Sequence, residues 1–284
     1  MRHAVLGAGG IGGLIAGALE HAGGEVVLLL TPQTLGAYRG QMTVESAVLG
    51  TFEAAIPAAS VLDREVDVLW ITTKATQLES AIASAPADLV GDAEVIPLLN
   101  GVDHLAALRN RYETVRAAAI RVESERVTPE LFRQRSPFLR VEMVGAEDVQ
   151  AELRAAGIDC RSRDDELSLL WDKLAFLAPI ALTTAALASP LGDARTDPRF
   201  AACLEEAVLI AGAEGAHLDH AALEAQHGNA PAEMRSSMQK DVAAGREPEL
   251  DAIAGPILRG GTTHSISTDA TQDLVDQIRS HSAA

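Results

Sequence analysis

The first residues that could do chemistry are glycines near the amino terminus. The spacing Gly7-x-Gly9-x-x-Gly12 follows a short apolar run, His3 to Leu6, and leads into apolar residues at helical spacing. In that setting Gly7 allows a tight turn, Gly9 lets a pyrophosphate approach the backbone, and Gly12 lets helix and strand pack closely. The N–H groups that open the helix favour phosphate. The pattern therefore predicts a dinucleotide-binding turn, with a ligand-free βα turn as the alternative.

Two polar residues follow buried strands. Lys74 comes after residues 67–73, and Asn100-Gly101 comes after residues 94–99. Open α/β sheets bind ligands at the carboxyl edge of their strands. Lys74 and Asn100 either share a site at that edge or serve as ordinary capping and surface residues.

Lys173 stands near the start of a long, otherwise uncharged run. Asp164-Asp165-Glu166 supplies the cap and acidic first turn of a helix that runs to about Pro190 and contains Pro179. This segment is too short and interrupted for a membrane span, so we expect a buried, kinked helix between two domains. A buried ammonium has a lowered pKa suited to acid–base work. The alternative is that Lys173 reaches solvent or pairs with Asp172.

The elements that must position these residues fall into two groups. The first half carries strand and helix patterns, with a left-handed helix cap expected at Gly23-Gly24 and a helix over 147–156. Its expected strands cover residues 3–6, 26–30, 67–73, 94–99, 115–122 and 137–144, with short strands within 41–60. The second half predicts helices over 198–215, 219–227, 231–244, 248–259 and 268–280. We therefore expect an α/β protein with an N-terminal Rossmann NAD(P)-binding domain over residues 1–163 and an all-α C-terminal substrate and dimerisation domain over residues 164–284.

The end of the second strand is where a dinucleotide fold selects its cofactor. Thr31-Pro32-Gln33-Thr34 offers no acid for the ribose hydroxyls, which argues against strict NAD and against FAD. No arginine follows at once for a 2′-phosphate, and Arg39 is read as a solvated helix residue. NADP(H) is favoured on this basis, and NAD(H) is not excluded.

Composition limits the partners. The chain has 284 residues, with 40 Asp and Glu against 23 Lys and Arg, a net charge of −17. We expect no nucleic-acid and no membrane partner. Cys160 and Cys203 do not have the spacing of metal ligands, so we expect free thiols in a reducing compartment. The first strand is expected to start at residue 2 or 3, which leaves no room for a signal peptide. We therefore expect a cytoplasmic protein. His217, His220 and His227 lack the carboxylate or cysteine of a familiar metal motif, so no metal site is expected.

Over nearly its whole length the chain resembles the ketopantoate reductase (2-dehydropantoate 2-reductase) family. The resemblance rests on the segment Gly7-Ala8-Gly9-Gly10-Ile11-Gly12, on Lys74, on Asn100-Gly101 and on Trp171-Asp172-Lys173-Leu174. It continues in Ser236-Ser237-Met238-Gln239-Lys240-Asp241 and in Gly245-Arg246-Glu247-Pro248-Glu249-Leu250-Asp251.

The resemblance implies NADPH-dependent reduction of a 2-oxo acid to a 2-hydroxy acid, in a cleft between a Rossmann and a helical domain. Lys173 would stabilise charge on the carbonyl oxygen and donate the proton, and Glu249 would orient it. Ser236 would bind substrate, and Asn100 would bridge substrate and nicotinamide. The glycine turn with Ala8 and Ile11, together with Thr31 and Lys74, would hold the cofactor. The family also suggests a homodimer.

This sequence departs from the family at several positions. Leu177, Ala181 and Leu191 stand where the family has three asparagines that line the substrate pocket, and Thr31-Pro32 replaces an arginine. A site that lacks such hydrogen-bonding groups discriminates poorly for a polar substrate, so a less polar 2-oxo acid would fit better.

Two other hypotheses remain open. One is a cofactor-binding protein without turnover that has a regulatory or structural role; the missing asparagines favour it, whereas Lys173 and Glu249 oppose it. The other is a β-hydroxy acid dehydrogenase of related architecture, against which the paired serines and Glu249 argue.

Overall fold

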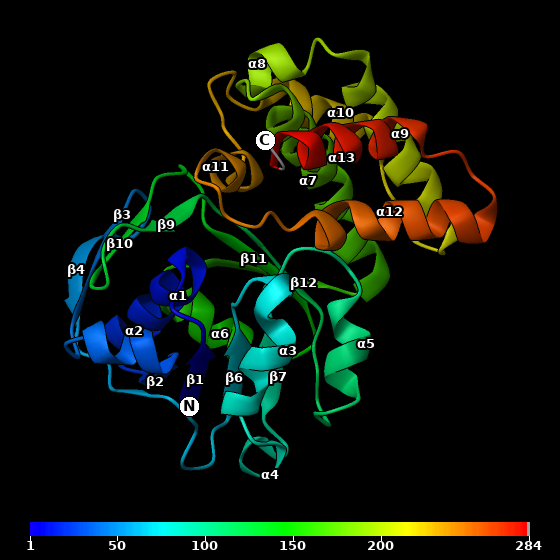
Figure 1. The fold of residues 1–284 in the computed structure, drawn as a ribbon. Coiled ribbons are helices and arrows are strands. Elements are labelled where there is room, and N and C mark those ends of the chain that lie inside the picture. Colours follow the sequence, from blue (N-terminus) through cyan, green and yellow to red (C-terminus); the bar gives the residue numbers. More distant parts are fainter. Residues whose placement is uncertain (283–284) are drawn as a thin grey trace. The chain divides into compact units, whose positions relative to one another are not determined.

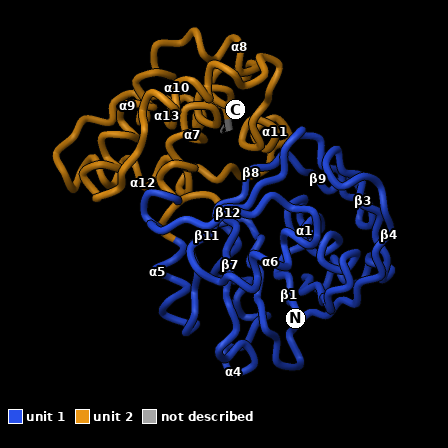
Figure 2. The backbone as a smooth tube through the Cα atoms, turned by 180° about the vertical axis from the view of Figure 1, so that it is seen from behind, with its two compact units in different colours: residues 1–99, 104–169 blue, residues 100–103, 170–284 orange. Residues whose placement is uncertain are grey.

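The computed structural model describes residues 1–282, and by its internal contacts the chain divides into two compact units (Figure 2). Unit 1 comprises residues 1–99 and 104–169, and unit 2 comprises residues 100–103 and those from 170 onward. Residues 283–284, the end of the expected helical domain, lie outside the described residues.

Unit 1 is built on a five-stranded parallel sheet in the order β5-β2-β1-β6-β7 (Figure 1). Its strands are β1 (Arg2–Leu6), β2 (Glu25–Leu29), β5 (Ala58–Ala59), β6 (Val68–Ile71) and β7 (Glu94–Pro97). The helices between them are α1 (Gly10–His21), α2 (Pro32–Ala37), η1 (Ala75–Gln77), α3 (Leu78–Ala81), η2 (Ile82–Ser84), α4 (Ala87–Val90) and, after β7, α5 (His104–Arg109). Gly23 closes α1 with a φ of +93°, the left-handed conformation expected there.

A second sheet covers α1. Its order is β4-β3-β10-β9, from β3 (Met42–Ser46), β4 (Gly50–Ala54), β9 (Ser124–Arg126) and β10 (Leu131–Gln134). Helix α1 contacts all four of these strands as well as β1 and β2, so it lies between the two sheets. The sequence does not predict strands β9 and β10, because strands of three and four residues carry too little periodicity.

The third sheet has the order β12-β11-β8. It contains β8 (Ala118–Arg121), β11 (Arg140–Val144) and β12 (Asp159–Arg163), with α6 (Glu147–Ala155) packed on β12. Glu142 on β11 is buried, and its carboxylate is ion-paired to Arg121 and Arg163. Strand β12 was not expected, since four of its five residues are polar.

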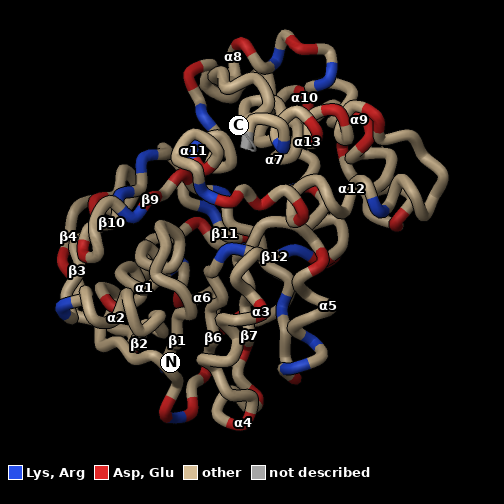
Figure 3. The backbone as a smooth tube through the Cα atoms, in the orientation of Figure 1, with Lys and Arg blue, Asp and Glu red and all other residues tan. Residues whose placement is uncertain are grey.

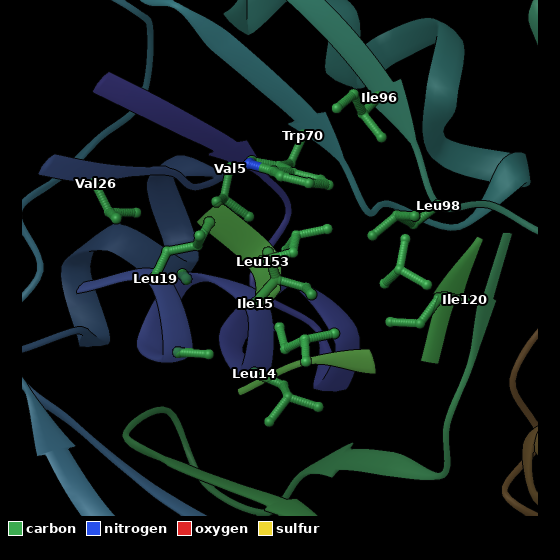
Figure 4. Close-up of a cluster of buried hydrophobic side chains, with 14 of the residues drawn as sticks. Val5, Leu14, Ile15, Leu19, Val26, Trp70, Ile96, Leu98, Ile120 and Leu153 are labelled. Carbon is green, nitrogen blue, oxygen red and sulfur yellow. The ribbon is translucent and has the colours of Figure 1, made fainter. Parts of the chain in front are cut away.

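The core of unit 1 gathers around α1 (Figure 4). Leu14, Ile15 and Leu19 of this helix pack with Val5 and Trp70 of the parallel sheet, all at most 2% exposed. Helix α6 adds Leu153 to the same cluster. This packing fixes the start of α1 against the end of β1, where the glycine turn lies.

Unit 2 is helical. Its longest helix, α7 (Glu166–Leu187), begins in the last residues of unit 1 and contains Pro179. The others are α8 (Leu191–Ala194), α9 (Pro198–Ala213), α10 (His220–Asn229), α11 (Ser237–Ala243), α12 (Leu250–His264) and α13 (Asp269–Ser282). Helix α7 is long and apolar enough to cross a membrane by length and composition, yet 83% of its most apolar window is buried, which is typical of a core helix.

The prediction of a helix over residues 231–244 is wrong for the first half of this range. Only α11 forms, and the carbonyl groups of Ala232 and Met234 instead accept the backbone N–H groups of Gly192 and Leu191 at 2.8 and 2.9 Å. These contacts satisfy the first donors of α8, which has no side-chain cap.

Candidate functional site

The glycine turn of unit 1 needs glycine for steric reasons. Gly7 has a φ of +97°, and a Cβ atom added to it would lie 2.9 Å from Thr73 Cγ2. A Cβ atom on Gly12 would lie 1.9 Å from the carbonyl oxygen of Gly7, so helix and turn could not pack as they do. Thr72 donates its hydroxyl to that same carbonyl at 2.6 Å.

The start of α1 suits an anionic group. Among residues 1–282 no side chain caps this helix, no acidic residue lies in its first turn, and the space where a Gly9 Cβ would stand is open. Backbone N–H groups at such a helix start favour phosphate. Gly9, Gly10 and Ile11 therefore fit the pyrophosphate of a dinucleotide, with Ala8 and Gly12 shaping the turn.

Strand β9 lies directly on this turn. A Cβ atom on Gly10 would stand 2.3 Å from the Ser124 carbonyl oxygen, and Ser124 donates its hydroxyl to the Gly10 carbonyl at 2.9 Å. Arg126 Nη1 donates to the Ala8 carbonyl at 3.4 Å. Neither Ser124 nor Arg126 is predicted from the sequence, because the strand that carries them is too short to be recognised by its periodicity.

The other expected cofactor residues lie at ends of elements in unit 1. Thr31 is the N-cap of α2 and accepts the Thr34 N–H with its hydroxyl, so capping occupies this group. Lys74 is half-buried at the N-cap of η1, just past β6. Arg39 is exposed.

The expected substrate residues lie in unit 2, including Asn100, although it follows β7 in the chain. Asn100 Nδ2 donates to Glu249 Oε2 at 3.2 Å. Next to it, Gly101 has a φ of +85°, and a Cβ atom there would stand 2.4 Å from the Ala252 carbonyl oxygen. The segment 100–103 is therefore packed closely on the first turn of α12.

An ion-pair network fastens the same segment. Arg259 Nη2 contacts Asp103 Oδ2 at 2.5 Å, and its Nη1 contacts Asp251 Oδ1 at 2.6 Å. One guanidinium thus joins the segment that carries Asn100 to the helix that follows Glu249. These side chains are exposed, so the ion pairs add little to the free energy of unfolding. Their effect is to hold segment 100–103 in place on α12.

Lys173 lies in the second turn of α7 and is only 8% exposed. Its neighbours Trp171 and Leu174 are buried as well. The Lys173 side chain is therefore largely removed from solvent.

Ser236 has a structural role in this fold. Its hydroxyl accepts the Gln239 N–H at 3.0 Å as the N-cap of α11 and lies 2.7 Å from Thr184 Oγ1 of α7. Thr184 in turn donates to the Ile180 carbonyl. The neighbouring Ser237 is exposed, and no side-chain hydrogen bond of it occurs within the described residues.

Apolar side chains occupy the three positions where asparagines were expected from the family pattern. Ala181 and Leu191 are fully buried, and Leu191 packs with Ile180 and Phe200. Leu177 is half-buried.

His227, one of the three histidines weighed as metal ligands, is part of the packing of unit 2. Its ring stacks on Phe176 at 5.0 Å between centroids, and Nε2 lies 2.8 Å from the Phe176 carbonyl oxygen. Burial lowers the pKa of His227 below its usual 6.5.

Both halves of the chain match profiles of a single family. Residues 3–143 match the profile described as ketopantoate reductase PanE/ApbA, and residues 166–282 match its C-terminal counterpart. The chain belongs to the ketopantoate reductase family. This membership confirms the expected family and the expected enzyme class, an NAD(P)H-dependent oxidoreductase of carbonyl and hydroxyl groups.

Relatives of known name are similar over their full length. The 2-dehydropantoate 2-reductase of Caulobacter vibrioides is 29% identical over 284 residues, which covers 96% of each chain. The enzyme of the same name from Archaeoglobus fulgidus is 23% identical over 294 residues, covering 97% of this chain and 96% of the relative.

Solved structures confirm the expected fold class. A PanE/ApbA family ketopantoate reductase from Ralstonia eutropha superposes with a TM-score of 0.90 at 26% identity, covering 100% of this chain and 99% of that one. A D-mandelate dehydrogenase in complex with NADH and anilino(oxo)acetate gives the same TM-score at 21% identity and the same coverage, so it shares the fold.

Proposed function

We propose that this ketopantoate reductase family member reduces a 2-oxo acid to the 2-hydroxy acid with NADPH. The observation that supports it best is the hydrogen bond between Asn100 and Glu249, which joins two polar residues 149 positions apart in the sequence. The glycine turn of unit 1 and the buried Lys173 of unit 2 supply the other parts such a reaction needs. The bound cofactor supplies a hydride to the carbonyl carbon.

The protein's own residues then have complementary roles. Charge grows on the carbonyl oxygen during reduction, and the Lys173 ammonium stabilises this charge and donates the proton. Glu249 orients the substrate and balances the charge of the lysine, while Asn100 holds the Glu249 carboxylate through its amide. Ser237 is the better substrate ligand of the serine pair, because capping and Thr184 occupy the Ser236 hydroxyl.

The substrate we propose is less polar than ketopantoate. Leu177, Ala181 and Leu191 have no side-chain hydrogen-bonding groups, and Leu191 belongs to an apolar cluster. A substrate hydroxyl at these positions would lose its partners, which costs affinity. D-mandelate dehydrogenase, which shares the fold, has been solved with anilino(oxo)acetate, an acid that carries an aromatic group. An aromatic side group on the substrate acid is in keeping with this similarity.

A cofactor-binding protein without turnover is the second candidate. The same three apolar positions favour it, since they remove the polar lining expected for the family substrate. Lys173 argues against this second candidate. Its side chain is only 8% exposed, and removing an ammonium group from water costs free energy that a protein without turnover has no catalytic reason to spend.

The deciding experiment follows NADPH oxidation at 340 nm with ketopantoate, with less polar 2-oxo acids and with NADH in parallel. Lys173→Ala should lower kcat by about 10²-fold to 10⁴-fold while the Kd for NADPH stays within twofold. Lys240→Ala, which removes an exposed lysine, is the matched control and should keep full turnover. Tight NADPH binding without turnover of any acid would establish the second candidate instead.

We also propose a cytoplasmic homodimer. A ketopantoate reductase from Staphylococcus aureus with the same fold is described as dimeric, at 17% identity and a TM-score of 0.82 over 100% of this chain and 99% of that one. Cys160 and Cys203 are both free and buried, in keeping with a reducing compartment. Light scattering on the purified protein distinguishes a dimer from a monomer of 29.8 kDa.

A further inference from the structure

We propose that Arg126 binds a phosphate group of the nicotinamide cofactor. The inference rests on the proposed use of NADPH and adds a residue that the glycine motif does not contain. It is carried by the position of Arg126 on β9 and by the partners of its guanidinium.

The strand directs Arg126 to the glycine turn. Side chains two apart on a strand share a face, so Arg126 points to the same side as Ser124, whose hydroxyl donates to the Gly10 carbonyl. Across the ladder Arg126 is paired with Phe132, whose ring would stand 2.2 Å from a Cβ atom on Gly13. This face of β9 and β10 therefore lies against α1, beside the N–H groups that favour phosphate.

The guanidinium of Arg126 differs from its neighbours in its partners. On strands β8 to β12 the other arginines are ion-paired, as Arg133 is to Glu45 and Arg140 to Asp159. Within residues 1–282 Arg126 instead donates only to carbonyl oxygens, those of Ala8 and Thr128. A guanidinium has five N–H donors, so most of its capacity is left for an anion. In Figure 3 the Lys and Arg positions around β9 and β10 alternate with Asp and Glu positions.

The rest of unit 1 gives a reason for a cation at this place. The protein carries a net charge of −17, which opposes binding of an anionic cofactor unless a local cation compensates. After β2, the Thr31 hydroxyl is used for capping and Arg39 is exposed. Arg126 places a permanent positive charge next to the turn, and arginine suits phosphate because it can donate two parallel hydrogen bonds.

The test is the affinity of the protein for each cofactor, measured by calorimetry without substrate. Arg126→Ala should weaken binding of NADPH by about 10-fold to 100-fold, the loss expected for hydrogen bonds to a charged group. Arg126→Lys should recover part of the affinity, because it restores the charge without the planar donor pair. Arg133→Ala is the matched control: it removes the same charge from the same sheet, on the other face and from an existing ion pair, and should leave the Kd unchanged.

NADH in parallel identifies the phosphate. Equal weakening for NADPH and NADH assigns Arg126 to the pyrophosphate, and weakening confined to NADPH assigns it to the 2′-phosphate. An unchanged Kd for both cofactors in a folded Arg126→Ala protein overturns the inference while the proposed function stands. Failure of the wild-type protein to bind either cofactor overturns the proposed function, and the inference with it.

Discussion

Asn100 Nδ2 donates a hydrogen bond to Glu249 Oε2 at 3.2 Å. Asn100 follows a strand of unit 1, whereas Glu249 precedes α12 in the helical unit, and by its contacts the segment 100–103 belongs to the helical unit. Asn100 and Glu249 therefore belong to the same compact unit. The hydrogen bond fixes the position of the Asn100 amide relative to the Glu249 carboxylate, two groups that we propose for the active site.

Replacing Asn100 by Asp tests this relationship. The change puts two carboxylates at hydrogen-bond distance, and like charges so close raise the pKa of one of them. We expect kcat/KM at pH 8 to fall by about 10-fold to 100-fold, since a hydrogen bond to a charged group is lost. Part of the activity should return at lower pH, where the pair shares a proton. Steady-state kinetics between pH 5 and 8 measure both effects.

Asn110→Asp is the control for this experiment, because it adds the same charge at an exposed residue. It should keep the wild-type pH profile. A wild-type profile for Asn100→Asp as well would contradict a functional link between Asn100 and Glu249.

Gly101→Ala should displace the same segment. Its Cβ atom would stand 2.4 Å from the Ala252 carbonyl oxygen at a φ of +85°, so the backbone must shift away from α12. We expect kcat/KM to fall at least about tenfold, together with a loss of roughly 1–2 kcal/mol in the free energy of unfolding. Enzyme kinetics and urea denaturation of the same preparation measure the two quantities.

Gly40→Ala separates backbone strain from displacement. Gly40 has a φ of +83°, but apart from its two chain neighbours no described residue has an atom within 4 Å of a Cβ placed there. This variant should show a similar loss of stability and unchanged kinetics. If both variants lose activity equally, close packing of Gly101 on α12 is not what positions Asn100.

The serine pair gives a third prediction. Ser236→Ala removes the N-cap of α11 and a bond to Thr184, so the free energy of unfolding should fall by about 1–2 kcal/mol. Ser237→Ala should change stability by less than about 0.5 kcal/mol, as surface substitutions usually do, and raise KM for the acid. Urea unfolding and KM measurements on both variants decide between them. If Ser236→Ala instead raised KM and left the free energy of unfolding unchanged, Ser236 rather than Ser237 would be the substrate ligand.

Local patterns in the sequence were enough to predict part of this fold. The glycine turn after β1 and the left-handed Gly23 can be recognised from neighbouring residues alone, and the structure has both. The apolar runs that form β6 and β7 placed Lys74 and Asn100 just past the ends of their strands for the same reason.

Other features depend on contacts between distant segments, which a local pattern does not contain. Strand β9 has three residues, and it exists because it pairs with β10 and packs on the glycine turn. Arg126 was therefore not recognised as a neighbour of that turn. Likewise, the role of Ser236 follows from Thr184, 52 residues away. The family resemblance draws attention to the serine pair, but it does not show that the Ser236 hydroxyl caps α11 and contacts Thr184.

The last prediction concerns pH and stability. The pKa of His227 lies below 6.5 in the folded protein because burial disfavours its charged form. Nε2 lies at the Phe176 carbonyl oxygen, and Nδ1 is buried with no hydrogen-bond partner among residues 1–282, so a second proton has no acceptor. As pH falls through 6.5 the unfolded chain takes up this proton more readily than the folded protein, so the free energy of unfolding falls as pH falls.

We expect His227 to lower the free energy of unfolding as pH falls from 7.5 to 5.5, because its pKa is lower in the folded protein than in the unfolded chain. His227→Gln keeps a donor for the Phe176 carbonyl but cannot titrate, so its free energy of unfolding should depend less on pH than that of the wild type. His220→Gln, at an exposed position of the same helix, should follow the wild-type curve. Urea unfolding at both pH values provides the measurement. His3, whose pKa burial also lowers, is present in all three proteins, so its contribution cancels in the comparison. Parallel curves for His227→Gln and the wild type would show that His227 takes up its proton equally well in the folded protein, contrary to its burial.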